Sequence, residues 1–205
     1  MCEESDRIRV FISSKQDEFH TERIVLADKL RSAPILVPIL ANNWQPQRSR
    51  PEERYVQDVR RSPIYLGLFG GMYSNATRLE YEEAWRHPHR EILIYVKSTA
   101  RVHKRLAQFI DVLKSRHVVF PFRHVGDLLP VVVDHVYAAI GRMVARYQQV
   151  LNENGTALLG VDPSATRAKD YHGLGFPGHF STDNLDRWAR LIATLQGERK
   201  NVDRT

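Results

Sequence analysis

The apolar residues of this 205-residue chain fall into short runs, separated by longer stretches with helical periodicity. Five runs have the length of buried strands and are rich in Ile, Val, Leu, Phe and Tyr. They are residues 7–13, 34–40, 63–70, 91–97 and 117–122. The third run is continuously apolar, as expected for a strand covered on both faces, whereas Pro38 indicates that the second run is an edge strand.

Helical patterns fill most of the intervals between these strands. They cover residues 14–30, 51–61, 77–87, 100–115 and 125–151, the last with an expected bend at Pro130. The first helix has one face marked by Phe19, Arg23, Leu26 and Leu30. Ser14 is placed to cap the start of that helix.

The alternation of strands and helices predicts a parallel sheet with helices on both faces. We therefore expect an α/β fold of the flavodoxin-like, doubly wound kind with five parallel strands. Residues 1–6 would be a polar tail, residues 7–150 the domain and residues 151–205 a C-terminal extension. One helix is expected in the extension, at residues 182–196, and we favour its packing on its own domain over docking of a partner protein.

The net charge of +6 comes entirely from residues 1–150, which contain 23 basic and 17 acidic residues. A basic domain attracts anionic ligands such as nucleotides. The basic residues are scattered and are not interleaved with aromatic residues, so the pattern favours a solvated surface over a nucleic-acid groove. No group of His, Asp and Glu residues has the spacing of a metal site, and we expect no metal.

The only cysteine is Cys2, which excludes an intramolecular disulfide and fits a reducing, cytoplasmic location. No apolar run approaches the roughly 20 residues needed to cross a membrane. The polar first ten residues do not resemble a secretory signal. We therefore expect a cytoplasmic protein that does not contact membranes.

Two segments after predicted strands combine turn residues with reactive side chains, and ligands bind at such strand ends in doubly wound folds. The first is Ser13 with Ser14, where one serine would cap a helix whose N–H groups attract phosphate. The second is residues 70–80. Its candidate ligand-contacting residues are Gly70, Gly71, Tyr73, Ser74, Thr77 and Glu80.

Thr77 and Glu80 allow two interpretations. Their spacing is that of a capping box, in which Glu80 would bond back to the start of its own helix. The same spacing also suits a carboxylate at the mouth of a pocket. From the motif alone, the cap is the simpler interpretation.

Several ordered segments resemble a TIR-like domain. They are "VFISS" (10–14), "DEFHTER" (17–23), "YLGLFGGMYS" (65–74), "TRLEYEEAW" (77–85) and "EILIYVK" (91–97). The closest resemblance is to the prokaryotic branch that opens with a "VFISS" strand, is common in defence and signalling proteins, and shares its architecture with nucleoside 2-deoxyribosyltransferases. The resemblance covers roughly residues 7–120.

The resemblance implies cleavage of an N-glycosidic bond, usually that between nicotinamide and ribose in NAD, which is a substrate and not a cofactor. Glu80 matches the family's catalytic glutamate, and with this match we favour catalysis over capping. Ser13 and Ser14 match the loop that approaches the substrate. Phe11 and Trp44 are further candidates for stacking on a base, although a core position for Phe11 and shielding of the core by Trp44 are the simpler interpretations.

Three functions remain open from the sequence. The leading one is an NAD-consuming TIR-like enzyme that yields ADP-ribose, or a cyclic or conjugated product, in bacterial antiviral defence. The second is a non-catalytic TIR-like assembly module. The third is a nucleoside or nucleotide N-glycosidase or deoxyribosyltransferase. The family resemblance also implies self-association, and a separate sensor or effector protein is a possible partner because the chain has no P-loop.

Overall fold

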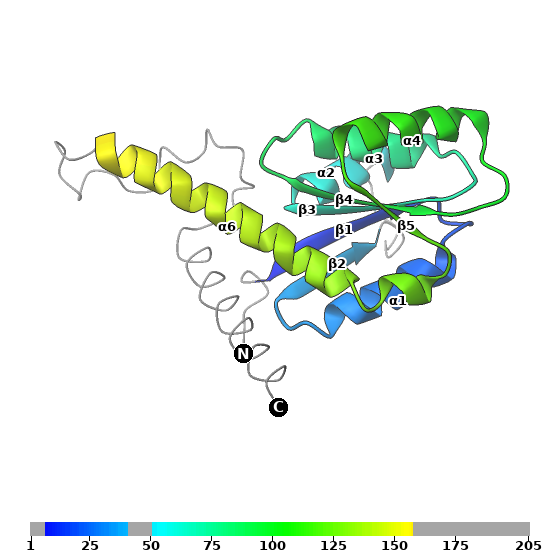
Figure 1. Cartoon of the computed structure of the whole chain (residues 1–205), viewed down its shortest axis with the longest axis horizontal. Coiled ribbons are helices and arrows are strands. Elements are labelled where there is room, and N and C mark those ends of the chain that lie inside the picture. Colours follow the sequence, from blue (N-terminus) through cyan, green and yellow to red (C-terminus); the bar gives the residue numbers. More distant parts are fainter. Residues whose placement is uncertain (1–6, 41–50, 158–205) are drawn as a thin grey trace. The chain divides into compact units, whose positions relative to one another are not determined.

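The computed structural model describes residues 7–40 and 51–157, and its centre is a parallel sheet of five strands (Figure 1). The strands are β1 (Ile8–Ser14), β2 (Leu36–Leu40), β3 (Ile64–Phe69), β4 (Glu91–Lys97) and β5 (Val119–Phe122). Their order is β2-β1-β3-β4-β5 and all pairs are parallel. This is the flavodoxin-like order, so the predicted fold class is confirmed. The predicted edge position of the strand containing Pro38 is confirmed as well.

The helices form a layer on each face of the sheet. Three of them, α2 (Pro51–Arg60), α3 (Asn75–Trp85) and α4 (Lys104–Arg116), lie on one face (Figure 1). On the other face α1 (His20–Arg31) lies beside the short α5 (Val125–Leu128). Helix α6 (Val132–Ala157) follows.

The start of α1 differs from the prediction. Ser14 does not cap the helix, because it is the last residue of β1 and pairs with Leu68 of β3. The chain then turns through residues 15–19, and the N-cap is Phe19, whose side chain forms no capping hydrogen bond. The strand extends one residue beyond the predicted one and is followed by the turn at residues 15–19. The helix therefore begins at His20 and not at Ser14.

The predicted single helix at residues 125–151 is two helices in the structure. The break lies at Pro130, between α5 and α6, as expected for a residue that cannot donate a backbone hydrogen bond. The Asp127 carboxylate accepts hydrogen bonds from the backbone N–H groups of Arg123 and His124, at 2.8 and 3.0 Å, and so holds the turn before α5.

Aromatic side chains dominate the core between the sheet and the layer of α2, α3 and α4. Phe11 of β1 stacks on Tyr65 of β3, with 6.2 Å between ring centroids. Tyr65 in turn meets Tyr81 of α3 edge-on, and Tyr81 meets Phe109 of α4 in the same way. These large, closely packed rings fix α3 against the sheet. Phe11 is therefore a core residue, as the simpler interpretation held.

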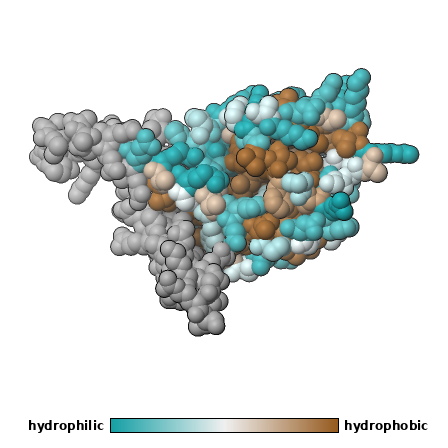
Figure 2. All heavy atoms as spheres, in the orientation of Figure 1, coloured by the Kyte–Doolittle hydropathy of each residue, from teal (hydrophilic) through white to brown (hydrophobic). Residues whose placement is uncertain are grey.

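The edge at β5 is less covered. Figure 2 shows apolar side chains gathered between α4 and α1, over the sheet. Val118, directly before β5, is 97% exposed.

Among the described helices, none combines the length and apolar character needed to cross a bilayer.

The chain divides into two compact units, residues 1–136 and residues 137–205, and α6 contains the boundary. All five strands and their carboxyl ends belong to the first unit. The helix predicted at residues 182–196 lies outside the described residues, as does Trp44.

Candidate functional site

The start of α3 decides between the two interpretations of Glu80. The N-cap is Ser74, whose Oγ accepts a hydrogen bond of 3.2 Å from the backbone N–H of Thr77. Thr77 is the third residue of the helix and is itself buried. The capping-box interpretation of Thr77 and Glu80, which was not the favoured one, is therefore wrong. Glu80 lies well inside the helix, so its carboxylate is free to reach another element.

That element is β1. The Ser13 hydroxyl donates a hydrogen bond to Oε2 of Glu80. Ser13 is two residues after Phe11 in the strand, so both side chains lie on the face of the sheet that α3 covers. The Glu80 side chain is only 6% exposed. The fold thus places a buried carboxylate at the carboxyl end of β1, where ligands bind in doubly wound folds.

Burial has a large electrostatic effect on this carboxylate. Loss of solvation raises the pKa of Glu80 from 4.5 to about 7, although the Ser13 hydrogen bond and the Arg23 charge both oppose the rise. A carboxyl group with this pKa exchanges its proton near neutral pH, as a group used in catalysis often does.

Arg23 is the cation that faces Glu80 across the site. It lies in the first turns of α1, is 3% exposed, and has a pKa lowered by burial against the opposing effect of the Glu80 charge. No described residue forms an ion pair with it, and its Nε atom is buried without a hydrogen-bond partner. In the sequence, the helical periodicity placed Arg23 on the apolar face of its helix. A charged residue is unusual there, and this was the only sequence signal that Arg23 is buried.

Two tyrosines complete the surroundings of Glu80. The ring of Tyr65 occupies the space above Gly67, since a Cβ at that glycine would lie 2.9 Å from the ring. Burial, and then the Glu80 charge, raise the pKa of Tyr65 well above its usual value. Its hydroxyl lies near Ser13 but forms no hydrogen bond of normal geometry. The pKa of Tyr55, on α2, is also raised by burial and by Glu80.

The neighbouring Glu83 shows what a structural carboxylate looks like on the same helix. It is buried and forms ion pairs with Arg60 at 2.6 Å and Arg86 at 3.1 Å. Burial alone would raise the pKa of Glu83, but these cations outweigh it and lower the pKa. Glu80 has no comparable set of ion pairs among the described residues, which distinguishes it from a residue that serves only stability.

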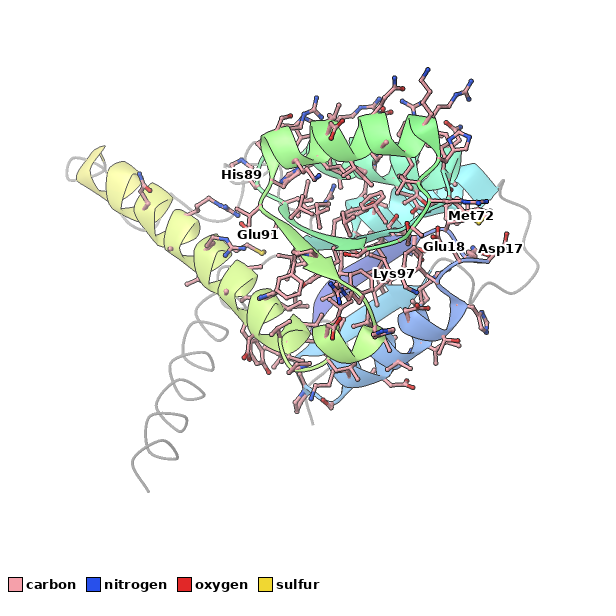
Figure 3. All side chains as sticks on the ribbon, turned by 45° about the vertical axis from the view of Figure 1, so that its right-hand side comes forward. Asp17, Glu18, Met72, His89, Glu91 and Lys97 are labelled. Carbon is pink, nitrogen blue, oxygen red and sulfur yellow. The ribbon has the colours of Figure 1, made fainter. Side chains whose placement is uncertain are left out.

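Gly70 and Gly71 lie where loops of the protein pack closely against one another, and Gly70 also lines a shallow hollow. The Glu18 carboxylate, in the turn after β1, accepts hydrogen bonds from the N–H groups of Gly71 at 2.5 Å and Met72 at 3.1 Å. Figure 3 shows Glu18 next to Met72. A Cβ on Gly71 would lie 2.7 Å from the carbonyl oxygen of Arg101. The glycines therefore allow loops to approach one another closely.

Replacing Gly70 with Ala should lower the free energy of unfolding by about 1–3 kcal/mol, because the added methyl group would overlap Glu18 and lie 2.9 Å from the Phe19 ring. Chemical denaturation measures the change. Gly141→Ala, in α6, is the control, because nothing lies within 4 Å of its added Cβ and an alanine favours the helix. Equal effects of the two substitutions would contradict this account of Gly70.

A hollow beside the site contains the other predicted residues of the β3–α3 loop. Tyr73, Ser74 and Thr77 line it together with Lys15 and Glu18. It is shallow: its cavity volume is only about 10 Å³, and the rest is open to solvent. Tyr73 stacks on His103, with 6.1 Å between ring centroids.

Ser14 points away from Glu80, because consecutive strand residues such as Ser13 and Ser14 point to opposite faces of the sheet. The buried hydroxyl of Ser14 has no hydrogen-bond partner among the described residues.

The comparison with protein-family models agrees with the extent of this domain. The model of a family described as a domain of unknown function (DUF4062) matches residues 9–137, more than half of the chain. The chain belongs to this family. No curated protein matched the sequence. The DUF4062 match covers β1 from Arg9 onward and the other four strands in full, and it includes Ser13, Arg23, Tyr65 and Glu80.

Proposed function

We propose that this DUF4062 protein is a TIR-like enzyme that cleaves the bond between nicotinamide and ribose in NAD. The observation that carries the proposal is the buried Glu80 carboxylate, bonded to Ser13 at the carboxyl end of β1. By the family resemblance, Glu80 matches the catalytic glutamate of TIR-like enzymes. In this assignment Glu80 is the catalytic residue and NAD is the substrate.

The reaction requires only one carboxylate. When the C1–N bond breaks, its electron pair leaves with nicotinamide, which departs as a neutral molecule. The ribose then carries an oxocarbenium charge, which an ionised Glu80 would stabilise. Water adds to C1 and releases a proton, giving ADP-ribose. If a hydroxyl or ring nitrogen of the same molecule adds in place of water, the product is cyclic.

The burial of Glu80 bears on how such an enzyme would be controlled. A carboxylate that is 6% exposed in the single chain must become accessible before NAD reaches it. Self-association that opens the site would couple assembly to activity, which fits the expectation of a homo-oligomer. A role in antiviral defence follows from the family resemblance alone.

A substrate screen tests the proposal. The purified protein is incubated with NAD, nucleosides and nucleotides, over a range of protein concentrations, and the products are identified by mass spectrometry. We expect nicotinamide and ADP-ribose, or a cyclic isomer, with a rate per molecule that rises with protein concentration. Release of bases from nucleosides with intact NAD would support an N-glycosidase, and no turnover in any mixture would support a non-catalytic module.

A further inference from the structure

Two buried polar groups near Glu80 lack partners. They are Nε of Arg23 and the hydroxyl of Tyr65. Neither atom forms a hydrogen bond of normal geometry in the described part of the chain, although the Tyr65 hydroxyl lies near Ser13. The side chains are 3% and 0% exposed. Leaving a buried polar group unpaired destabilises the fold, so two at one place require an explanation.

Both groups face the same carboxylate. The Glu80 charge contributes to the pKa shifts of both Arg23 and Tyr65, so these side chains of α1 and β3 lie within electrostatic reach of it. The Ser13 hydroxyl bonds to Oε2 of Glu80. An ionised carboxylate has about four acceptor positions on its two oxygens, so this bond leaves capacity for a further donor. Acceptor and donor capacity therefore meet in one small region.

The unused groups match a neutral polyol better than an anion. A phosphate would pair with Arg23, but an ionised Glu80 carboxylate would repel its negative charge. A sugar hydroxyl can donate to the Glu80 carboxylate and accept from the Arg23 N–H at the same time. A second, adjacent hydroxyl can pair with the phenol of Tyr65.

We infer that Arg23 and Tyr65 contact the 2- and 3-hydroxyl groups of the substrate's sugar and make the site selective for ribosides over 2-deoxyribosides. The inference rests on the proposed function in taking Glu80 as the group that meets the sugar. It goes further by naming two specificity-determining residues and by separating the protein from deoxyribosyl transfer. A sugar without the 2-hydroxyl leaves a buried donor unpaired, and sites of this kind discriminate strongly against such analogues.

Binding of two sugar phosphates to the full-length protein tests the inference without turnover. The probes are ribose 5-phosphate and 2-deoxyribose 5-phosphate, titrated by NMR. Because both carry the same phosphate, its contribution cancels in the ratio of their affinities. We expect wild-type protein to prefer the ribose compound by about 100-fold or more.

The variants Tyr65→Phe and Arg23→Lys should each reduce this preference to about tenfold or less. Tyr65→Phe removes one oxygen and keeps the ring that packs on Phe11 and Tyr81. Arg23→Lys keeps the charge and removes the Nε donor. Arg31→Lys, an exposed change on the same helix, is the matched control and should keep the wild-type preference.

The possible outcomes separate this inference from the proposed function. Equal binding of the two sugar phosphates, or no binding of either, overturns the inference, even if the protein cleaves NAD. An unchanged preference in both site variants overturns the roles of Arg23 and Tyr65. A preference for ribose that depends on these residues, in a protein that leaves NAD intact, supports the inference and contradicts the choice of NAD.

Discussion

Glu80→Gln is expected to lower kcat/KM for NAD cleavage by at least about 100-fold, since the amide cannot offset a developing positive charge on the ribose. The substitution keeps the size of the side chain and an oxygen that accepts from Ser13. A loss of activity would therefore report the missing charge and not a collapsed site. The rate of nicotinamide release, monitored by chromatography, gives kcat/KM for both proteins.

The same helix supplies the control for this experiment. Glu82→Gln removes a half-exposed carboxylate that pairs with Arg78, and it should leave the rate unchanged. The wild-type kcat/KM should also rise with pH through about 7, as Glu80 loses its proton in the free enzyme. Turnover by Glu80→Gln at the wild-type rate would remove Glu80 from the mechanism.

The second large effect concerns stability and pH. Glu80 has a folded-state pKa of about 7 against 4.5 as its ordinary value, so between these pH values only the folded state holds the proton. The free energy of unfolding must then fall as pH rises across that window. The loss is about 3 kcal/mol, because a tenfold difference in proton affinity between the folded and unfolded states corresponds to about 1.4 kcal/mol.

Comparison with Glu80→Gln isolates this contribution from the other titrating groups. Relative to the variant, the wild type should lose about 3 kcal/mol of unfolding free energy between about pH 4.5 and about pH 7.5, by urea denaturation. The groups facing Glu80 do not titrate in that window, because they are the Ser13 hydroxyl, Arg23, Tyr55 and Tyr65. Parallel curves for the two proteins would show that Glu80 has an ordinary pKa.

The order of strands and helices could be predicted from the sequence because apolar periodicity reports which face of each element is buried. Element ends were less predictable. Ser14 was expected to begin a helix and instead ends β1, since pairing with Leu68 in β3 stabilises one more strand residue. The spacing of Thr77 and Glu80 allowed Thr77 to cap α3, but Ser74 does so from three residues earlier. Both serine and threonine suit a cap, and the backbone path decides which is used.

Some residues of the candidate site could likewise be predicted from the sequence, and others could not. The sequence predicted Glu80 and Ser13, because both lie at strand-end positions that the fold class brings together. It did not predict Glu18 as the partner of Gly71, since residues 53 positions apart meet only when the loops pack. It placed Arg23 on the same helix face as Leu26 and Leu30, but it did not predict that Glu80, on another helix, acts on the Arg23 charge.

The sequence by itself determined the fold class, the strand order expected of that class and the position of Glu80 near the carboxyl ends of the strands. The tertiary structure alone decided what surrounds that carboxylate. The hydrogen bond from Ser13, the unpaired Nε of Arg23 and the Tyr65 phenol come from three different elements, none of them local to α3. Periodicity records burial one element at a time, whereas the pKa of a carboxylate depends on every group that the packed elements bring to it.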